Sequence, residues 1–307
     1  MLKTVLIGSL PFCSVFIDEL NKATKLMGLF LTNASHKCFD KNRYECPIYT
    51  DGIDKVSAFL KAYQIDVVFV GGLSSRVPLE LMKIPTYGFL NIHPGKLPNN
   101  RGADPIFWSI KNAEKETSIS IHKMDANFDT GPILYEKKIP IILGETYGML
   151  NSKIILNSTG IVGEVLSKIE VLSNYKVQQE VNATYNLKPD KELLHINWEA
   201  QIADDIEFLV NACNPRYGGA TTYYHGGEIK ILEVSQVTGQ QPLFGRTAGE
   251  IVHAHPIEGL YVVCKYGQLL KVKTMSTDAG VLSGEKYVSL GMQVGQKFSA
   301  EIREYQT

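Results

Sequence analysis

The chain has 307 residues, of which 44% are hydrophobic and 21% charged, and its formal net charge is −1. This composition is typical of a globular protein and excludes a low-complexity or repetitive chain. The near-zero charge gives no sign of a polyanionic partner. No apolar run is long enough to cross a bilayer or to serve as a signal segment, and the five cysteines contain no C-x-x-C pair. We therefore expect a cytoplasmic protein with reduced thiols.

The chain opens with a predicted strand, a glycine and a helical pattern. Thr4–Ile7 is a short apolar run, Gly8 follows it, and apolar residues keep helical spacing from Phe12 to about Met27. This order is typical of dinucleotide-binding folds, but the G-x-G-x-x-G fingerprint is absent, which disfavours a nicotinamide or flavin cofactor. Close packing of the strand on the helix is the simpler explanation of Gly8.

The next elements repeat the alternation of strand and helix. Gly28–Leu31 is predicted to be a second strand, Asp54–Gln64 an amphipathic helix, and Asp66–Val70 a third, buried strand. Gly71-Gly72-Leu73-Ser74-Ser75-Arg76 follows directly. Its two glycines leave backbone groups bare at the carboxyl edge of the sheet, where main-chain hydrogen bonds can bind a flat heterocycle. The alternative is an ordinary strand-to-helix turn, leading into a short helix over Val77–Lys83.

An amide and an imidazole stand together at the end of the next predicted strand. Gly88–Ile92 is an apolar run that Pro94-Gly95 terminates. With a period of two, Asn91 and His93 point to the same face. Open α/β sheets place ligands at the carboxyl ends of their strands, so this pair is a candidate site.

A carboxylate follows on a second segment. Ser118–His122 alternates as a strand does, and the loop Met124–Gly131 ends in Phe128-Asp129-Thr130-Gly131. If the two strands are neighbours, Asp129 can reach His93. An amide, an imidazole and an orienting carboxylate suit proton transfer and oxyanion stabilisation. The alternative is that each residue is structural: a cap, a core histidine and a turn residue.

The two motifs together resemble those of one enzyme family. N-I-H-P-x-x-L-P-x-x-R-G, followed after 26 residues by the F-D-T-G loop, resembles the formyltetrahydrofolate-dependent formyltransferases. The resemblance implies a Rossmann-like α/β domain with a mostly parallel sheet, a 10-formyltetrahydrofolate donor and a primary amine acceptor. It assigns the catalytic roles to Asn91, His93 and Asp129. Asn91 and His93 would donate to the oxyanion, while Asp129 would orient the imidazole and help to remove the amine proton.

The same resemblance suggests residues that bind the two substrates. The candidates on the folate side are Gly72, Leu73, Ser74, Arg76, Asp125 and Phe128. Those on the acceptor side are Gly8, Lys96, Arg101 and Asp104. Two of these have simpler explanations: Lys96 as an exposed lysine, and Asp104 as the N-cap of a predicted helix over Asp104–Lys111 with Pro105 at its first position.

A second domain is predicted after a connector. Lys137–Ile142 is a predicted strand and Thr146–Leu172 a long helix. Six short β runs between glycines follow residue 220 and predict a small OB-like barrel. We expect a catalytic domain over residues 1–185, a linker over 186–205 that resembles the linker of the family, and an OB-like domain over 206–307. The β runs are Thr221–Tyr224, Glu228–Val234, Ala248–His253, Leu260–Lys265, Gln268–Thr274 and Lys297–Ile302.

The distribution of charged residues helps to predict which amine accepts the formyl group. Residues 206–307 contain nine Lys/Arg and nine Asp/Glu, whereas a nucleic-acid-binding barrel usually has a positive excess. Basic residues between 32 and 49 are diluted by acidic ones, unlike the basic insertion of methionyl-tRNA formyltransferases. We therefore expect a small amine, most simply a nucleotide-linked amino sugar. Methionyl-tRNA is the first alternative, and a folate-binding protein without transfer, or a hydrolase, is the second.

Two further expectations concern metals and assembly. Cys38 and Cys46 lack the spacing of a recognised metal site, and His253 with His255 lacks a third ligand, so no metal is predicted. The barrel is expected to be structural or to support a homodimer.

Overall fold

The structure is a computed structural model that describes residues 1–32, 39–50, 54–73, 75–171, 174–239 and 241–300. Contacts divide the chain into two compact units. The N-terminal unit consists of Met1–Pro105, Glu116–Pro140 and Asn151–Leu187, and the C-terminal unit of Ile106–Lys115, Ile141–Leu150 and residues from Lys188 onward. The domain limits expected from the sequence stay predictions.

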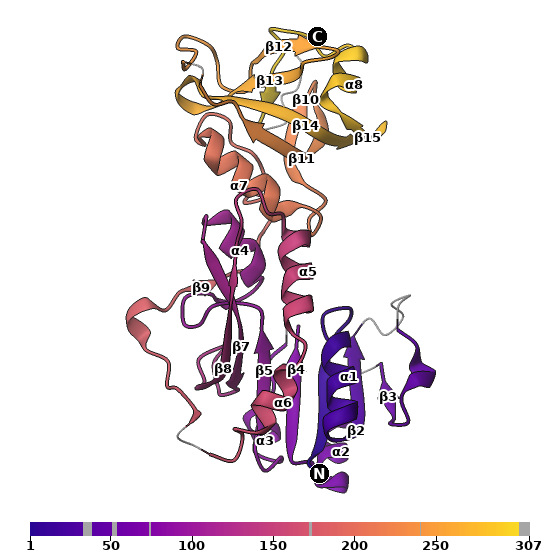
Figure 1. Cartoon of the computed structure of the whole chain (residues 1–307). Helices are drawn as coiled ribbons and strands as arrows, with labels where there is room; N and C mark the ends of the chain where they lie inside the picture. Colours follow the sequence, from indigo (N-terminus) through magenta and orange to yellow (C-terminus); the bar gives the residue numbers. More distant parts are fainter. Residues whose placement is uncertain (33–38, 51–53, 74, 172–173, 240, 301–307) are drawn as a thin grey trace. The chain divides into compact units, whose positions relative to one another are not determined.

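A seven-stranded sheet forms the centre of the N-terminal unit, in the order β3-β2-β1-β4-β5-β7-β8 (Figure 1). The first five of these strands are parallel, and β7 and β8 run antiparallel to their neighbours. This confirms the predicted Rossmann-like, mostly parallel sheet. The strands are β1 Lys3–Ser9, β2 Lys25–Thr32, β3 Ile48–Tyr49, β4 Val67–Gly71, β5 Phe89–His93, β7 Glu116–Lys123 and β8 Ile133–Pro140.

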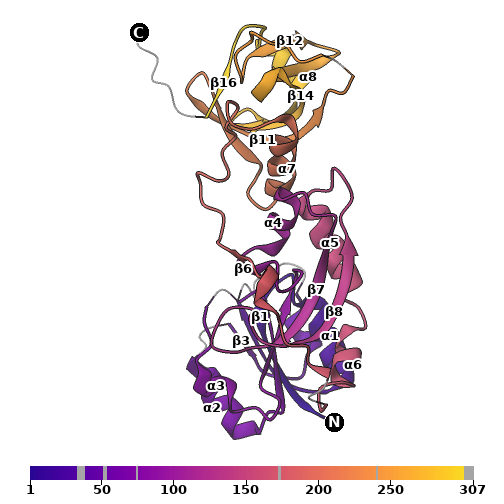
Figure 2. The same ribbon diagram turned by 90° about the vertical axis from the view of Figure 1, so that its left-hand side faces the viewer.

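Helices cover both faces of this sheet (Figures 1 and 2). On one face, α2 (Asp54–Tyr63) and α3 (Leu79–Met82) bury Phe59 and Leu81 against apolar side chains of β1 and β4. On the other face, α1 (Ser14–Ala23) buries Phe16 and contacts α6 (Ile161–Leu166). Burial of apolar surface on both faces explains why β4 and residues 5–7 of β1 are apolar.

Several element boundaries differ from the sequence prediction. The first helix ends at Ala23 rather than Met27, because Lys25 already pairs with Lys3 in the sheet. The strand predicted from Lys137 starts at Ile133, since its first residues pair with β7.

The prediction of a single long helix over Thr146–Leu172 is also wrong. It is two helices, α5 (Tyr147–Asn157) and α6, separated at Gly160, which has φ 86°. The carboxylate of Glu19 accepts hydrogen bonds from the backbone N–H groups of Gly160 and Val162 and so satisfies the start of α6.

Two short strands connect distant parts of the N-terminal unit. β6 (Arg101–Gly102) pairs in parallel with β9 (Tyr185–Asn186). The 3-10 turns Lys41–Arg43 and Glu180–Asn182 also belong to this unit. The pairing of β6 with β9 matters below, because it brings residues 176–186 beside the candidate site.

An antiparallel sheet forms most of the C-terminal unit, in the order β12-β13-β14-β11-β10-β16, with β15 paired to β14. All six predicted β runs are present. The prediction missed β15 and the short helix α8, which are too brief to show periodicity. The elements are α4 Pro105–Lys111, α7 Ala203–Cys213, β10 Ala220–Tyr224, β11 Gly227–Gln236, β12 Ile251–His255, β13 Gly259–Val263, the 3-10 turn Lys265–Gly267, β14 Leu269–Thr277, β15 Gly280–Ser283, α8 Gly284–Ser289 and β16 Phe298–Ser299.

The sheet of the C-terminal unit curls back on itself. β16 pairs with β10, and the preceding residue Lys297 forms a bridge to Glu250, at the start of β12. The first and last strands of the sheet are thereby joined, which protects their edges. Together the two sheets confirm the predicted fold class. Among the described residues, no helix has the length and apolarity to span a membrane.

Candidate active site

The end of β5 and the strand beside it bring the site together. β5 lies between parallel β4 and antiparallel β7 (Figure 1). In this register Asn91 stands opposite His122, and His93 stands opposite Ser120. The loop that follows β7 returns toward β5 and places Asp129 at the same point. The predicted condition, that the two strands be neighbours, is therefore met.

The carboxylate of Asp129 is the hub of the cluster. Its Oδ1 accepts a hydrogen bond from Asn91 Nδ2 at 3.0 Å, and His122 Nε2 lies 3.1 Å from the same oxygen. Its Oδ2 accepts the backbone N–H of Gly102 at 2.9 Å. His93 Nδ1 lies 3.7 Å from Oδ1, which is too long for a hydrogen bond but close enough for charge interaction. The structure thus brings the three predicted catalytic residues together.

Burial and charge set the protonation of the cluster. Burial alone would raise the pKa of Asp129, but the neighbouring imidazoles and the Gly102 N–H outweigh it and hold the pKa well below its usual range. Burial lowers the pKa of His93, and the charge of Asp129 opposes this only in part. Near neutral pH, the cluster therefore contains an ionised carboxylate beside a neutral His93 imidazole.

The tautomer of His93 follows from its second contact. His93 Nε2 lies 2.7 Å from the carbonyl oxygen of Asn100, and a carbonyl only accepts, so Nε2 carries the proton. In the neutral ring, Nδ1 then has a lone pair and faces Asp129. The nitrogen that faces the carboxylate is a proton acceptor, which is the property required of a general base.

Sequence reasoning missed His122. It is 1% exposed, with Nε2 3.1 Å from Asp129 Oδ1 and Nδ1 3.1 Å from the carbonyl oxygen of Lys123. The alternation of residues 118–122 indicated a strand ending at this histidine. The cross-strand pairing with Asn91, which brings it into the cluster, depends on the register and was not visible in the sequence.

A tight turn presents Asp129. Its φ is 57°, in the left-handed region that non-glycine residues rarely adopt. Within the loop, Asp125 Oδ1 accepts hydrogen bonds from Asn127 N and Thr130 Oγ1. Asp125, predicted to contact folate, thus shapes the loop that carries the carboxylate. Its predicted contact with folate stays a prediction.

On the folate side, the predicted residues form a partly exposed surface. Gly72, in the turn after β4, has φ 67°, a left-handed conformation that glycine adopts without steric cost. The Arg76 guanidinium lies over the ring of Phe128, 5.1 Å from its centroid, and the ring is 41% exposed. Leu73 is half-buried, and Ser74 lies outside the described residues. An exposed aromatic ring beside bare backbone suits a flat heterocycle.

On the acceptor side, three predicted residues have partners within the chain. A Cβ on Gly8 would lie 2.5 Å from the Gly71 carbonyl oxygen, so this glycine permits close backbone packing. Lys96 Nζ pairs with Glu116 at 2.7 Å. Asp104 directly precedes α4 with φ 51°, whereas an N-cap residue has an extended backbone. The N-cap explanation of Asp104 therefore does not fit its backbone.

Arg101, the fourth, is fully buried. Its guanidinium donates to Gln178, Glu180 and Tyr185, all from the segment that contains β9. In this arrangement Arg101 holds a segment of its own chain, and its predicted contact with the acceptor stays a prediction.

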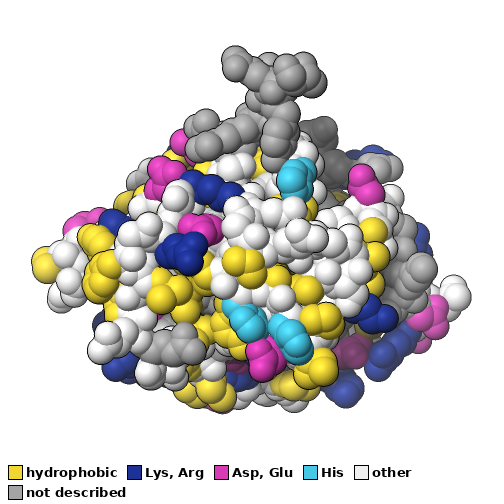
Figure 3. Space-filling model, turned by 90° about the horizontal axis from the view of Figure 1, so that it is seen from above, with side chains coloured by type: hydrophobic (Ala, Val, Ile, Leu, Met, Phe, Trp, Pro, Cys, Tyr) yellow, Lys and Arg dark blue, Asp and Glu magenta, His cyan; other side chains and the backbone are white. Residues whose placement is uncertain are grey.

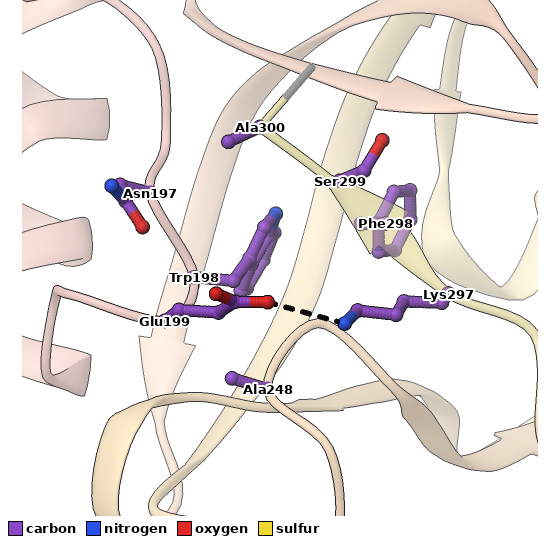
Figure 4. Close-up of a pocket in the computed structure, with 8 residues that line it drawn as sticks. All are labelled: Asn197, Trp198, Glu199, Ala248, Lys297, Phe298, Ser299 and Ala300. Atoms are coloured by element: carbon purple, nitrogen blue, oxygen red, sulfur yellow. Dashed lines mark ion pairs between the residues drawn. The ribbon is translucent and has the colours of Figure 1, made fainter. Parts of the chain in front are cut away.

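A pocket in the C-terminal unit is separate from this cluster. Its lining includes Trp198, Phe298 and the ion pair of Lys297 with Glu199, whose Nζ and Oε1 are 3.5 Å apart (Figure 4). None of the predicted site residues line it. Within the part of the chain that the structure describes, no three His, Cys, Asp or Glu side chains are grouped to hold a metal. Cys38 lies outside that part.

Comparisons with known proteins decide the family. Residues 32–165 match the family described as formyl transferase, and residues 188–288 match the formyl transferase C-terminal domain. The chain is 33% identical to the methionyl-tRNA formyltransferase of Acetivibrio thermocellus over 232 residues, which are 75% of this chain and 73% of that one. It is 31% identical to the methionyl-tRNA formyltransferase of Nitrosospira multiformis over 249 residues, covering 78% and 76%.

The chain belongs to the formyl transferase family. The fold is also that of a solved N-formyltransferase from Helicobacter canadensis, crystallised with folinic acid and dTDP-3-aminofucose. The TM-score is 0.65 at 16% identity, and the match covers 89% of this chain and 99% of that one. As a family member, the protein is a folate-dependent formyltransferase whose formyl donor is 10-formyltetrahydrofolate.

Proposed function

We propose that the acceptor is a small primary amine, most simply the amino group of a nucleotide-linked amino sugar. The observation that carries this is the charge of residues 206–307. Nine Lys/Arg balance nine Asp/Glu over residues 206–307. A surface that binds tRNA needs cations available to phosphates, because phosphate contacts supply most of the affinity.

Five of the nine cations of residues 206–307 are engaged by acidic side chains. Among the described residues on the face seen in Figure 3, basic side chains are scattered beside acidic ones and form no continuous patch. Each of five cations there lies within 3.5 Å of a carboxylate oxygen, which leaves little positive potential for a polyanion. The pairs are Lys230–Glu228, Arg246–Glu250, Lys271–Glu285, Lys273–Glu233 and Lys297–Glu199.

Among the basic residues after β2, Arg43 supports the same conclusion. Arg43 pairs with Asp18 at 3.3 Å, and Tyr44 donates to the same carboxylate at 2.7 Å. Lys37 lies outside the described residues. Within the described part of this segment, the arginine is thus engaged by α1.

The cluster accounts for the chemistry of transfer. The donor supplies the formyl group, and Gly72, Leu73, Arg76 and Phe128 form the surface that would hold its pteridine. Asn91 would donate from Nδ2 to the formyl oxygen as negative charge develops there. This proposal keeps the predicted role of Asn91 and assigns His93 as the base. Of the two roles predicted for Asp129, it keeps the orientation of the imidazole and drops the removal of the amine proton.

Proton movement runs through His93. As the amine nitrogen bonds to the formyl carbon, its proton passes to His93 Nδ1, and the carboxylate of Asp129 stabilises the imidazolium. His93 then returns the proton to the leaving nitrogen of the donor as the carbon–nitrogen bond breaks. The low pKa of Asp129 favours this electrostatic role over that of a proton carrier.

Methionyl-tRNA is the second candidate acceptor, because relatives 31–33% identical over about three quarters of the chain are methionyl-tRNA formyltransferases. A direct comparison separates the two. The purified enzyme and 10-formyltetrahydrofolate are incubated with a panel of nucleotide-linked amino sugars and, separately, with methionyl-tRNA, and formylated products are identified by mass spectrometry. We expect turnover with an amino sugar and none with methionyl-tRNA. Efficient formylation of methionyl-tRNA alone would overturn the proposal.

A further inference from the structure

A segment without catalytic residues lies against the active-site loops. We call residues Lys176–Asn186 the strap. At its start, Lys176 exchanges backbone hydrogen bonds with Ile133. At its end, Arg101 N donates to the carbonyl oxygen of Thr184, and Asn186 Nδ2 donates to Asn100 Oδ1 at 2.8 Å. The strap is therefore fixed at both ends to segments that flank the cluster.

We infer that Gln178, in the middle of the strap, is a positioning residue for the Asp129 carboxylate. The inference rests on the catalytic role proposed for Asp129. Gln178 Nε2 donates to the carbonyl oxygen of Asp129 at 2.8 Å and to that of Gly131 at 2.7 Å. Gln178 is buried, and these two bonds hold the backbone on both sides of Thr130.

Arg101 fixes the orientation of the Gln178 amide. Arg101 Nε donates to Gln178 Oε1 at 3.0 Å, so the oxygen of the amide faces the guanidinium and the NH₂ group faces the two carbonyls. Arg101 is held in turn by a two-point contact with the Glu180 carboxylate and by the Tyr185 hydroxyl. A flipped amide would place two donors together and two acceptors together, which the burial of the group makes costly.

The loop needs these hydrogen bonds because the backbone of Asp129 has an unfavourable conformation. A non-glycine residue at φ 57° is in a sparsely populated region and keeps that conformation only when its surroundings impose it. The carboxylate oxygens must also meet Asn91, His122 and Gly102 at fixed distances. A displacement of about 1 Å in a reacting group is enough to lower a rate about a hundredfold. Gln178 bonds to the carbonyl of Asp129 and not to its carboxylate, so it acts through the backbone.

The test uses adjacent glutamines. Gln178→Met keeps the approximate length of the side chain but removes both donors and the acceptor. The matched control is Gln179→Met, because Gln179 is the next residue and is exposed. We expect kcat for formyl transfer to fall at least about tenfold in Gln178→Met, with the donor KM within about threefold of wild type and Gln179→Met unchanged. A kcat reduced by less than this in folded Gln178→Met would overturn the inference.

A second readout follows the carboxylate itself. The His93 imidazole is titrated by NMR in the protein without substrates, since a displaced Asp129 stabilises the imidazolium less. We expect the titration of His93 to move to lower pH in Gln178→Met and to stay in place in Gln179→Met. An unmoved titration in Gln178→Met would contradict a positioning role, because a purely structural residue would change stability alone.

Two further variants complete the design. If Gln178→Met does not fold, Gln178→Glu takes its place with the same kcat criterion, because it keeps an acceptor for Arg101 and loses the donors. His93→Ala is measured in parallel. Transfer that persists in His93→Ala refutes the proposed site. A different result refutes only the role of Gln178. In that case transfer is lost in His93→Ala but retained in folded Gln178→Met, or in Gln178→Glu if that variant replaces it.

Discussion

At the scale of single residues, the chemistry depends on the protonation of His93. Its Nε2–H is committed to the carbonyl of Asn100 at 2.7 Å, and burial lowers its pKa. Nδ1 is therefore the nitrogen that gains and loses the proton. The same burial that excludes water from the ring makes it a base rather than a resting cation near neutral pH.

The first prediction concerns this titration. NMR of the imidazole Cε1–H in the substrate-free protein should give His93 a pKa below the ordinary value of about 6.5. In Asp129→Asn the pKa should fall further, because the negative charge that favours the imidazolium is removed. The His93 signal is assigned by its loss in His93→Ala. A pKa above 7, or one that rises in Asp129→Asn, would contradict the assigned environment.

The residues also show what a sequence can predict. Asn91 and His93 follow from a period of two in a short apolar strand, and Asp129 follows from the turn chemistry of D-T-G. His122 and Gln178 do not follow in the same way. Each joins the cluster through a contact set by tertiary structure: His122 through the register of β7 on β5, and Gln178 through the return of the strap to the Asp129 loop.

At the scale of elements, the pairing of β6 with β9 is what holds the strap in place. Gly102, in β6, has φ 91°, and a Cβ there would lie 2.3 Å from the carbonyl oxygen of Asn186. Its backbone N–H also donates to Asp129. One glycine thus permits the close approach of the strap and supplies a hydrogen bond to the carboxylate.

The second prediction follows from this glycine. Gly102→Ala should lower the free energy of unfolding by about 2–4 kcal/mol, combining an unfavourable left-handed backbone with a collision between backbone atoms. The matched control is Gly144→Ala, with φ 81° and open space around the position, which should cost only about 1 kcal/mol. Urea denaturation of both variants measures the difference. Equal losses would show that β6 and β9 do not approach as described.

Element boundaries were less predictable than element types. The apolar positions of Thr146–Leu172 continue at helical spacing across Gly160, so periodicity alone gives one helix. The break arises from a left-handed glycine and from the Glu19 carboxylate, which caps the second helix from a distant part of the sequence. Neither the conformation of that glycine nor its partner is encoded in local spacing.

At the scale of the whole molecule, charge distinguishes the two candidate acceptors. A net charge of −1 and paired cations in the C-terminal unit leave little to attract a nucleic acid. The composition of residues 206–307 was visible in the sequence, but three of the five ion pairs were not, because their partners are far apart in the sequence.

The third prediction is therefore a binding measurement. Titration with tRNA at several salt concentrations should show only weak association at physiological salt, in the nonspecific range of about 10⁻⁴ to 10⁻⁶ M. A nucleotide-linked amino sugar should bind with a much shallower dependence on salt, since it carries few phosphates. Tight tRNA binding that weakens steeply with salt would favour methionyl-tRNA as the acceptor.

The most direct test of the account measures transfer in single turnover. Asn91→Ala and His93→Ala are compared with Asn42→Ala and His255→Ala, whose side chains are exposed and lie outside the cluster. Loss of an oxyanion donor or of a general base typically costs about a hundredfold or more, so both site variants should lose at least this much while remaining folded. The two control variants should keep the wild-type rate. A near-normal rate in either Asn91→Ala or His93→Ala would contradict the assignment of the active site.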